Sequence, residues 1–175
     1  MTRNRILAVD PGTREMGVAV FEGSDLLYYG IKTVSHRQEI DDVCGSAAKI
    51  IRQFIAAYQP RSVALVRRLV IQSNCERLVA VIHEVKRAAE GEGVAVYEYA
   101  PKSVRRFLCG PKRATKQHLA RIISSRYPEL AQYAEGRGVW EELYYARMFA
   151  AVAAGLTDYY ARAQMPAASN LIKSA

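Results

Sequence analysis

The chain has few cysteines and no long apolar run, and both shortages narrow its class. Its three cysteines, Cys44, Cys75 and Cys109, are odd in number, widely spaced and not accompanied by histidines. This pattern provides neither a disulfide framework nor a zinc signature, so we expect buried structural thiols. No apolar stretch reaches the roughly 18 residues that a membrane span needs, and the N-terminal residues lack a secretory pattern. We therefore expect a cytoplasmic protein with no membrane partner.

Acidic residues are missing from one long segment, residues 101–128. The chain has 25 basic and 17 acidic residues, and eight of the basic ones lie in this segment, so the 17 elsewhere balance the acids. The whole net charge of +8 is thus concentrated in one place, which is typical of a surface that binds a phosphate-rich partner. A solvated helix face is the alternative, although such faces usually include acids.

A carboxylate stands at the end of the first apolar run. Residues 6–9 are apolar and lead to Asp10, and Gly12 then allows a tight reversal into a second apolar run, 16–20. A carboxylate fixed at a strand end can hold a divalent metal or orient a phosphate. The alternative is a hairpin in which Asp10 merely caps the turn.

Hydrophobic patterning predicts a mixed order of strands and helices in one α/β domain over residues 1–162. Three strands joined by short turns come first, followed by helix, strand, helix, strand and three helices. The predicted strands are 4–11, 16–22, 26–34, 62–66 and 94–98, and the predicted helices are 37–58, 74–91, 101–109, 115–127 and 140–161. Residues 163–175 are small and polar, so we expect a flexible tail.

Four segments carry a family resemblance in addition to this order of elements. They are Asp10–Thr13 with its flanking strands, Val96–Arg105, Gly110–Lys116 and Tyr145–Ala153. In sequence order they resemble the first catalytic strand, the strand-to-helix passage, the phosphate-binding segment and the final helix of RuvC-type Holliday-junction resolvases. The resemblance implies an α/β ribonuclease H-like fold, with a five-stranded mixed sheet flanked by helices.

The resemblance also implies a homodimeric nuclease that cuts four-way DNA junctions with Mg²⁺ or Mn²⁺ held by four carboxylates. Asp10 and Glu142 match two of these positions and are the predicted catalytic residues and metal ligands. The other two positions hold Val66 and Tyr145, which are not carboxylates, and we expect Tyr145 to be an aromatic core residue. Glu141 is a further candidate ligand, which would need a shifted helix register. Glu142 lies on an apolar helix face, where it either points inward or stays exposed in the first turn.

The expected DNA-binding residues come from the basic segment and from the loop after the strand 62–66. Lys116 falls in the first turn of a helix that Thr115 or a nearby residue would cap, where free amides and lysine together could bind a phosphate; a solvent-facing lysine is the alternative. Leu69 stands where the family carries an aromatic wedge, although a core or dimer contact fits that loop equally well. The full predicted set is Arg67, Arg68, Leu69, Lys102, Arg105, Arg106, Lys112, Arg113 and Lys116.

Three functions remain open from the sequence. The first is a metal-dependent, structure-specific endonuclease acting on branched DNA. The second is a catalytically inactive pseudo-nuclease that binds DNA junctions without cutting them. The third is a nuclease similar to the small YqgF-type RNA-processing enzymes, which share the first motif. The helix 74–91 is the dimer element in the resembled family and could equally be a core helix.

Overall fold

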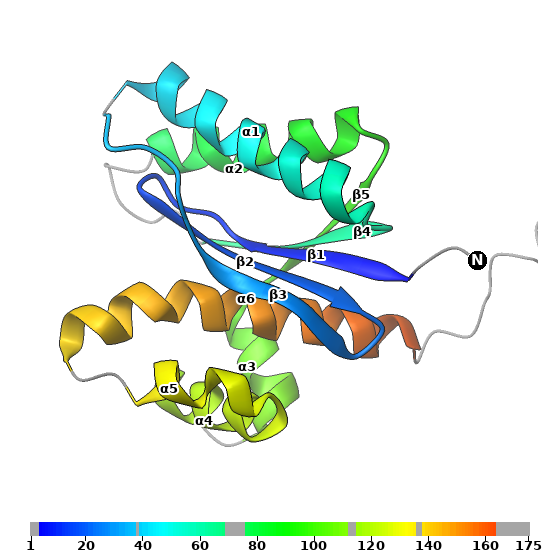
Figure 1. The fold of residues 1–175 in the computed structure, drawn as a ribbon, viewed down its shortest axis with the longest axis vertical. Helices are drawn as coiled ribbons and strands as arrows, with labels where there is room; N and C mark the ends of the chain where they lie inside the picture. The colour runs from blue at the N-terminus through cyan, green and yellow to red at the C-terminus, as the bar shows by residue number, and fades with distance from the viewer. Residues whose placement is uncertain (1–3, 38, 69–75, 112–114, 136–137, 164–175) are drawn as a thin grey trace, which may run out of the picture.

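The computed structural model has one sheet between two groups of helices (Figure 1). It describes residues 4–37, 39–68, 76–111, 115–135 and 138–163. The strands are β1 (Arg5–Asp10), β2 (Glu15–Glu22), β3 (Asp25–Thr33), β4 (Ser62–Val66) and β5 (Ala95–Tyr99). The helices are α1 (Ile40–Tyr58), α2 (Glu76–Gly91), α3 (Pro101–Cys109), α4 (Lys116–Arg126), α5 (Ala131–Ala134) and α6 (Val139–Ala163), with a 3-10 turn η1 (Pro128–Leu130).

The sheet has the strand order β3-β2-β1-β4-β5. The first three strands form an antiparallel meander, while β4 and β5 run parallel to β1. This mixed sheet flanked by helices confirms the predicted α/β architecture. Because β1 and β4 are parallel neighbours, the residues that follow each strand leave the sheet at the same edge, with Asp10 next to the loop after Val66.

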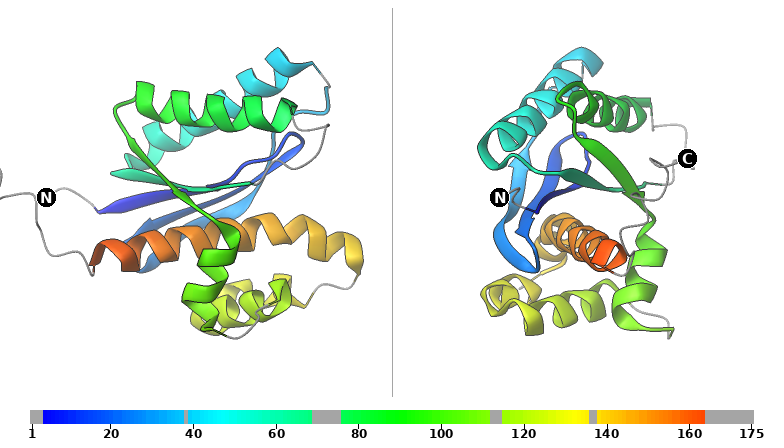
Figure 2. Two further views of the ribbon diagram at one scale, coloured as in Figure 1. Left: turned by 180° about the vertical axis from the view of Figure 1, so that it is seen from behind. Right: turned by 90° about the vertical axis from the view of Figure 1, so that its right-hand side faces the viewer.

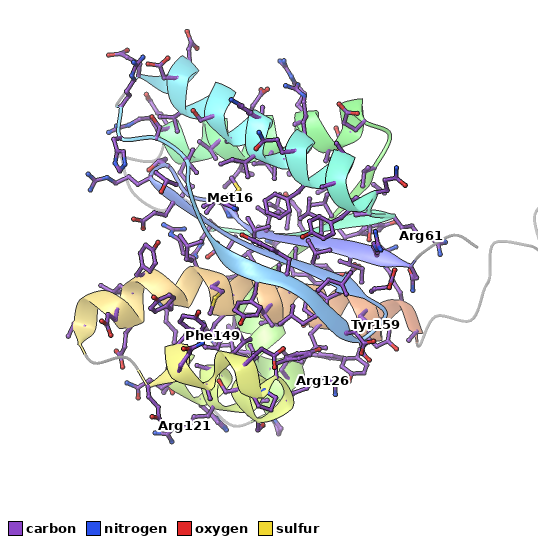
Figure 3. All side chains as sticks on the ribbon, viewed as in Figure 1. Met16, Arg61, Arg121, Arg126, Phe149 and Tyr159 are labelled. Atoms are coloured by element: carbon purple, nitrogen blue, oxygen red, sulfur yellow. The ribbon has the colours of Figure 1, made fainter. Side chains whose placement is uncertain are left out.

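The two faces of β1 are both covered, which explains its unbroken apolar sequence. Leu7 and Val9 belong to the core cluster under α1 and α2, whereas Ile6 and Ala8 belong to the cluster that packs against α6. Figure 3 shows the same division farther along the chain, with Met16 on the α1 side and Phe149 between α6 and the α4–α5 layer. The sheet therefore forms the middle of two separate cores.

Helix α6 crosses the lower face of the sheet at very close range (Figure 2). Gly17 of β2 permits this approach, because a Cβ atom there would overlap the backbone carbonyl of Arg147. Gly155 plays the same part from the helix side, since its Cβ atom would lie 2.7 Å from Cδ2 of Phe21. This close packing brings the side chain of Arg147 beside the turn between β1 and β2.

Several sequence predictions need adjustment. The short η1 and α5 between α4 and α6 were not predicted, and residues 74–75 of the predicted second helix lie outside the described residues. The predicted tail also lies outside them, except for Ala163, which ends α6. Cys44 and Cys109 are free and only partly buried, and Cys75 is not among the described residues. Among the helices described, none combines the length and the apolar character that crossing a bilayer requires.

Candidate functional site

Asp10 is fully buried at the end of β1 and is bound by an arginine from the adjacent strand end. Nε of Arg68 donates to Oδ1 of Asp10 at 2.8 Å, and the terminal nitrogen Nη2 donates to Oδ2. This is the two-bond pairing of a guanidinium with a carboxylate, the strongest geometry that such a pair adopts. The carboxylate that the sequence marked as a metal ligand is therefore occupied by a side chain of its own chain.

A second guanidinium approaches the same carboxylate from α6. Nη1 of Arg147 lies 3.9 Å from Oδ2 of Asp10 and donates a hydrogen bond of 3.0 Å to the carbonyl oxygen of Pro11. Gly12 makes room for this side chain, because a Cβ atom there would lie 2.8 Å from Cζ of Arg147. The glycine in the turn thus serves the packing of an arginine as well as the chain reversal.

Opposing effects act on the ionisation of Asp10. Burial raises the pKa of this carboxyl above its ordinary value of 3.8, and the charges of Arg68, Arg147 and Lys116 act in the other direction. The largest effect is the burial, as expected for a carboxylate with no exposed surface. Asp10 is a dry carboxylate whose charge is compensated by cations of the protein.

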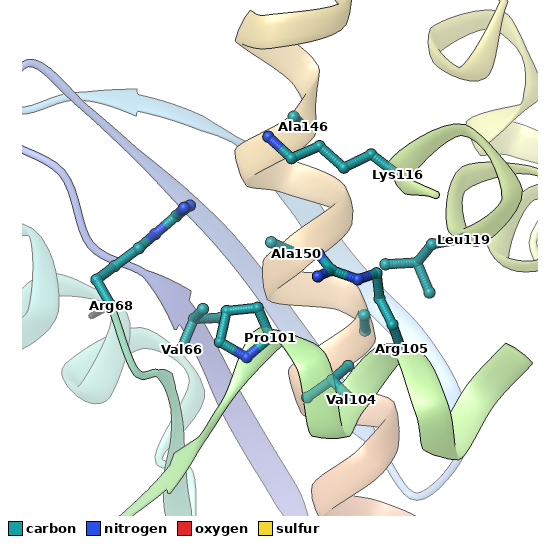
Figure 4. Close-up of a pocket in the computed structure, with 10 residues that line it drawn as sticks. Val66, Arg68, Pro101, Val104, Arg105, Lys116, Leu119, Ala146 and Ala150 are labelled. Carbon is teal, nitrogen blue, oxygen red and sulfur yellow. The ribbon is translucent and has the colours of Figure 1, made fainter. Parts of the chain in front are cut away.

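A small pocket opens beside this pair, between α6, α3 and α4 (Figure 4). Its volume is about 60 Å³. Three cationic side chains extend into it from three different elements: Arg68 after β4, Arg105 on α3 and Lys116 on α4. The rest of the lining is apolar and consists of Val66, Pro101, Val104, Leu119, Ala146, Ala150 and Ala153.

The two non-carboxylate positions are filled by packing residues. Val66 is 2% exposed and belongs to the core cluster around α6. Tyr145 packs against Tyr133, with ring centroids 4.8 Å apart, and against Tyr144 at 5.1 Å. Tyr145 is thus part of an aromatic cluster; it is only partly buried and packs against the core from its rim, so the prediction of a core aromatic holds in part.

The predicted acidic ligands on α6 lie in exposed positions of its first turn. Glu142 is exposed and accepts a hydrogen bond of 2.9 Å from Nε2 of Gln117 on α4. Glu141 is also exposed and lines a different surface hollow, together with Arg14 and Glu15. Within the described ranges, no three His, Cys, Asp or Glu side chains come together as a possible metal site.

The donor set does not fit a pair of divalent ions. Such ions need several anionic oxygen ligands around one shared phosphate. Asp10 has both oxygens bound by Arg68, and Val66 provides no donor. Around the buried carboxylate, the described side chains supply positive charge where a metal centre requires negative charge.

The predicted DNA-binding residues lie in different surroundings. Lys102 and Arg106 are exposed on α3 and Arg67 is exposed after β4, whereas Arg105 and Lys116 line the pocket. Thr115 caps α4 as expected, because its hydroxyl accepts from the amide of His118 at 3.1 Å. Leu69, Lys112 and Arg113 lie outside the described residues.

Sequence reasoning did not identify Arg147 as a site residue. A signal was present, since Arg147 is a lone cation in the otherwise uncharged run 143–157 of α6. It also missed Asp158, a fully buried carboxylate near the other end of α6. Asp158 is bound by Tyr99, by Ser62 and by Nε of Arg162, at 2.5, 3.3 and 3.0 Å respectively.

Comparisons with known proteins point to one family. The family model for crossover junction endodeoxyribonuclease RuvC matches residues 6–131, which include Asp10, Val66 and the basic segment but not α6. The RuvC endonuclease of Chlorobium chlorochromatii is 30% identical over 131 residues, which cover 68% of this chain and 65% of that protein, just under two thirds. The RuvC endonuclease of Caldanaerobacter subterraneus is 30% identical over 127 residues, covering 68% and 76% respectively.

Solved structures agree on the fold. Thermus thermophilus RuvC in complex with a Holliday junction substrate superposes with a TM-score of 0.72 at 22% identity, covering 91% of this chain and 96% of that one. The likeness confirms the ribonuclease H-like fold that the resemblance implied. It extends the correspondence beyond residue 131, so that most of the described chain has a counterpart in that fold.

Proposed function

The chain belongs to the RuvC family, and from this premise we propose that it binds branched DNA without cutting it. The relatives in the family are endonucleases, and one solved RuvC structure contains a Holliday junction. The proposal transfers the DNA-binding part of that activity to this chain. It does not transfer the metal-dependent cleavage, because no cluster of carboxylates that could hold a metal lies among the described residues.

The observation that carries the proposal is the bidentate pairing of Asp10 with Arg68. A metal ion would have to displace this guanidinium and take over a carboxylate that has no exposed surface. Breaking a fully buried ion pair typically costs about 3–5 kcal/mol, and this pair costs less to break because a third of the Arg68 side chain is exposed. A metal ion bound to Asp10 would find no carboxylate at Val66 or Tyr145, so a single ligand would have to offset that cost.

The basic segment supports the DNA-binding part. Its described residues form α3 and α4, which lie together in the layer below α6 (Figure 1). Exposed cations on these helices include Lys102, Arg106 and Lys116, and they belong to a segment that has no acidic residue. Such a surface binds the DNA backbone and gives an affinity that falls steeply with salt.

We also propose a homodimer, with α2 as its contact element, in a cytoplasmic setting. α2 follows the loop after β4 and has only four fully buried residues, which leaves a surface that a second copy could cover. Light scattering of the purified chain tests the dimer. A monomeric mass at the concentrations used for DNA binding would contradict this part of the proposal.

The test is a binding and cleavage assay with a labelled four-way junction, a linear duplex of the same sequence and a structured RNA. We expect preferential, salt-dependent binding of the junction and no product with Mg²⁺ or Mn²⁺. Arg52→Gln, an exposed cation on α1 in the opposite layer, is a matched charge control that should bind as the wild type does. Junction products that disappear in Asp10→Ala would support the nuclease instead, and preferential RNA processing would support the YqgF-like alternative.

A further inference from the structure

We propose that the pocket beside Asp10 binds one backbone phosphate of the DNA directly, with cationic side chains in place of metal ions. This inference deepens the proposed function and rests on it for the identity of the nucleic acid. It assigns the ligand-binding role to Arg105, Lys116 and Arg68. Asp10 becomes a positioning residue that holds Arg68 in the pocket.

The geometry shows convergence of cations from separate parts of the chain. Arg68, Arg105 and Lys116 are 37 and 11 residues apart in sequence, yet all three line the same pocket. Figure 4 shows their side chains extending from three elements toward the space beside α6, near Ala146 and Ala150. Like charges repel, so a fold that gathers them gains when an anion enters between them.

The charges in the pocket are not balanced by the protein. The charges of Arg68 and Lys116 act on Asp10, and both of its oxygens are bound by Arg68. Arg147 is a second cation within ion-pair distance of the Asp10 carboxylate. Neither Arg105 nor Lys116 forms a salt bridge with a carboxylate in the described part of the chain. The pocket thus keeps an excess of positive charge that a phosphate would neutralise.

The apolar lining strengthens the attraction. Val66, Pro101, Leu119 and Ala146 offer no side-chain hydrogen bonds to compete for the cations. An apolar wall also lowers the local dielectric constant, which increases the interaction of opposite charges. Val66 takes part in this lining from a position where the family has a carboxylate. The same substitution that removes a metal ligand therefore also removes a negative charge that would repel a phosphate.

The pocket suits a phosphate in size and in hydrogen-bond geometry. Its volume of about 60 Å³ is several times the ~10–15 Å³ that a single water needs, so a small oxyanion has room to enter. Guanidinium groups bind phosphate through two parallel hydrogen bonds, and lysine adds a point charge. Lys116 also stands at the N-terminus of α4, whose free amides favour an anion. No bond of the phosphate is broken, because the pocket holds it without an activated nucleophile.

The first experiment replaces single phosphates around the junction crossover with neutral methylphosphonates, in the presence of EDTA. We expect one linkage whose neutralisation weakens wild-type binding about tenfold or more, as for the loss of a charged hydrogen bond. Lys116→Gln and Arg105→Gln should each weaken binding to unmodified DNA. Neutralising that same linkage should then reduce the affinity of these variants little further. In the control Arg52→Gln, on α1, the methylphosphonate should keep its full effect. The inference would be overturned if the loss of affinity from Lys116→Gln or Arg105→Gln and the loss from the methylphosphonate multiplied at every linkage. Binding that requires Mg²⁺ would overturn it as well.

The second experiment separates the pocket from the DNA. Inorganic phosphate is titrated into arginine-labelled protein while the Nε–H resonances are followed by NMR. We expect saturable shifts of Arg68 and Arg105 that are lost in Lys116→Gln, against uniform weak drift of Arg52 and Arg87. Saturable shifts without any junction binding would contradict the proposed function and support the phosphate site. Uniform drift of all arginines, with junction binding intact, would overturn the phosphate site and leave the proposed function standing.

Discussion

At the scale of single residues, the chemistry around Asp10 depends on which partner holds its carboxylate. Both oxygens accept from Arg68, and the positive charge of this guanidinium opposes a divalent cation at the same carboxylate. The position of Asp10 at the end of a buried strand was predictable from the apolar run before it. The identity of its partner was not, because Arg68 reaches it through the parallel pairing of β1 with β4, a contact between residues 58 positions apart.

Replacing Arg68 tests how strongly Asp10 depends on this partner. Arg68→Ala leaves the buried carboxylate without its main hydrogen bonds, and we expect a loss of about 2–3 kcal/mol. This is less than for a fully buried pair because a third of the Arg68 side chain is exposed. Urea denaturation at neutral pH measures the loss. Asp10→Asn in the same background should recover part of it, since it removes the uncompensated charge.

The pH dependence of that variant has a definite sign. Burial raises the pKa of Asp10 above 3.8, so the folded state takes up the proton more readily than the unfolded state. Without Arg68 that pKa rises further, and the stability deficit of Arg68→Ala should shrink as the pH falls from neutral toward the acid range. A deficit that stays constant between these conditions would show that lost packing, rather than an unpaired charge, causes the destabilisation.

At the scale of elements, α6 determines which residues reach the site. Its middle lies against β1 and β2, whereas its first turn extends past the edge of the sheet (Figure 1). Arg147 consequently lies beside Asp10, while Glu142 reaches Gln117 on α4. Helical periodicity left open whether Glu142 points inward or stays exposed, and it could not show where along the helix the supporting sheet ends; in the structure Glu142 is exposed.

The close contact between α6 and β2 predicts different outcomes for two glycines. Gly17→Ala would push a methyl group into the backbone of Arg147, so we expect a loss of at least about 2 kcal/mol in free energy of unfolding. Gly45→Ala, at an exposed site in α1 with open space around it, should gain ~0.5–1 kcal/mol. Thermal or urea unfolding measures both. Equal effects would mean that α6 does not pack as closely as described.

A hydrogen-bond network at the far end of α6 has its own pH signature. The hydroxyl of Tyr99 donates to Oδ1 of Asp158, and burial followed by this carboxylate raises the pKa of Tyr99 above its ordinary value of 10.0. The contribution of this hydrogen bond to the free energy of unfolding is therefore complete below pH 10. It is lost as the pH rises through the higher pKa that Tyr99 has in the folded state. Tyr99→Phe should cost about 1–2 kcal/mol at neutral pH. The difference from wild type should shrink at alkaline pH, and a constant difference would argue against an ionisation effect.

At the scale of the whole molecule, the distribution of charge separates two roles. The excess of positive charge lies in a segment whose described residues form α3 and α4 in one layer, together with α6. Binding of DNA to this layer predicts that Lys116→Ala lowers the affinity for every DNA and reduces the salt slope by about one counterion. Filter binding over a range of salt concentrations measures this slope. An unchanged slope would place the DNA elsewhere on the protein.

The sequence predicted the architecture well because buried strands and amphipathic helices leave periodic patterns. The mixed sheet, the order of its elements and the cap at Thr115 all depend on such local signals. The site was harder to predict, because its features come from residues that meet only in the folded chain. Arg105 and Lys116 were identified as cations of a basic segment, but their convergence on a pocket with Arg68 is a property of the tertiary structure.

A titration of the wild-type protein with Mn²⁺, followed by paramagnetic broadening of the amide signals near Asp10, tests the central claim most directly. The claim is that Arg68, and not a metal ion, occupies this carboxylate. We predict no saturable broadening at Gly12 or Gly17 in the wild type. The combined variant Val66→Glu, Arg68→Ala, Tyr145→Asp is the positive control and should acquire it. Saturable broadening in the wild type that disappears in Asp10→Ala would contradict the account.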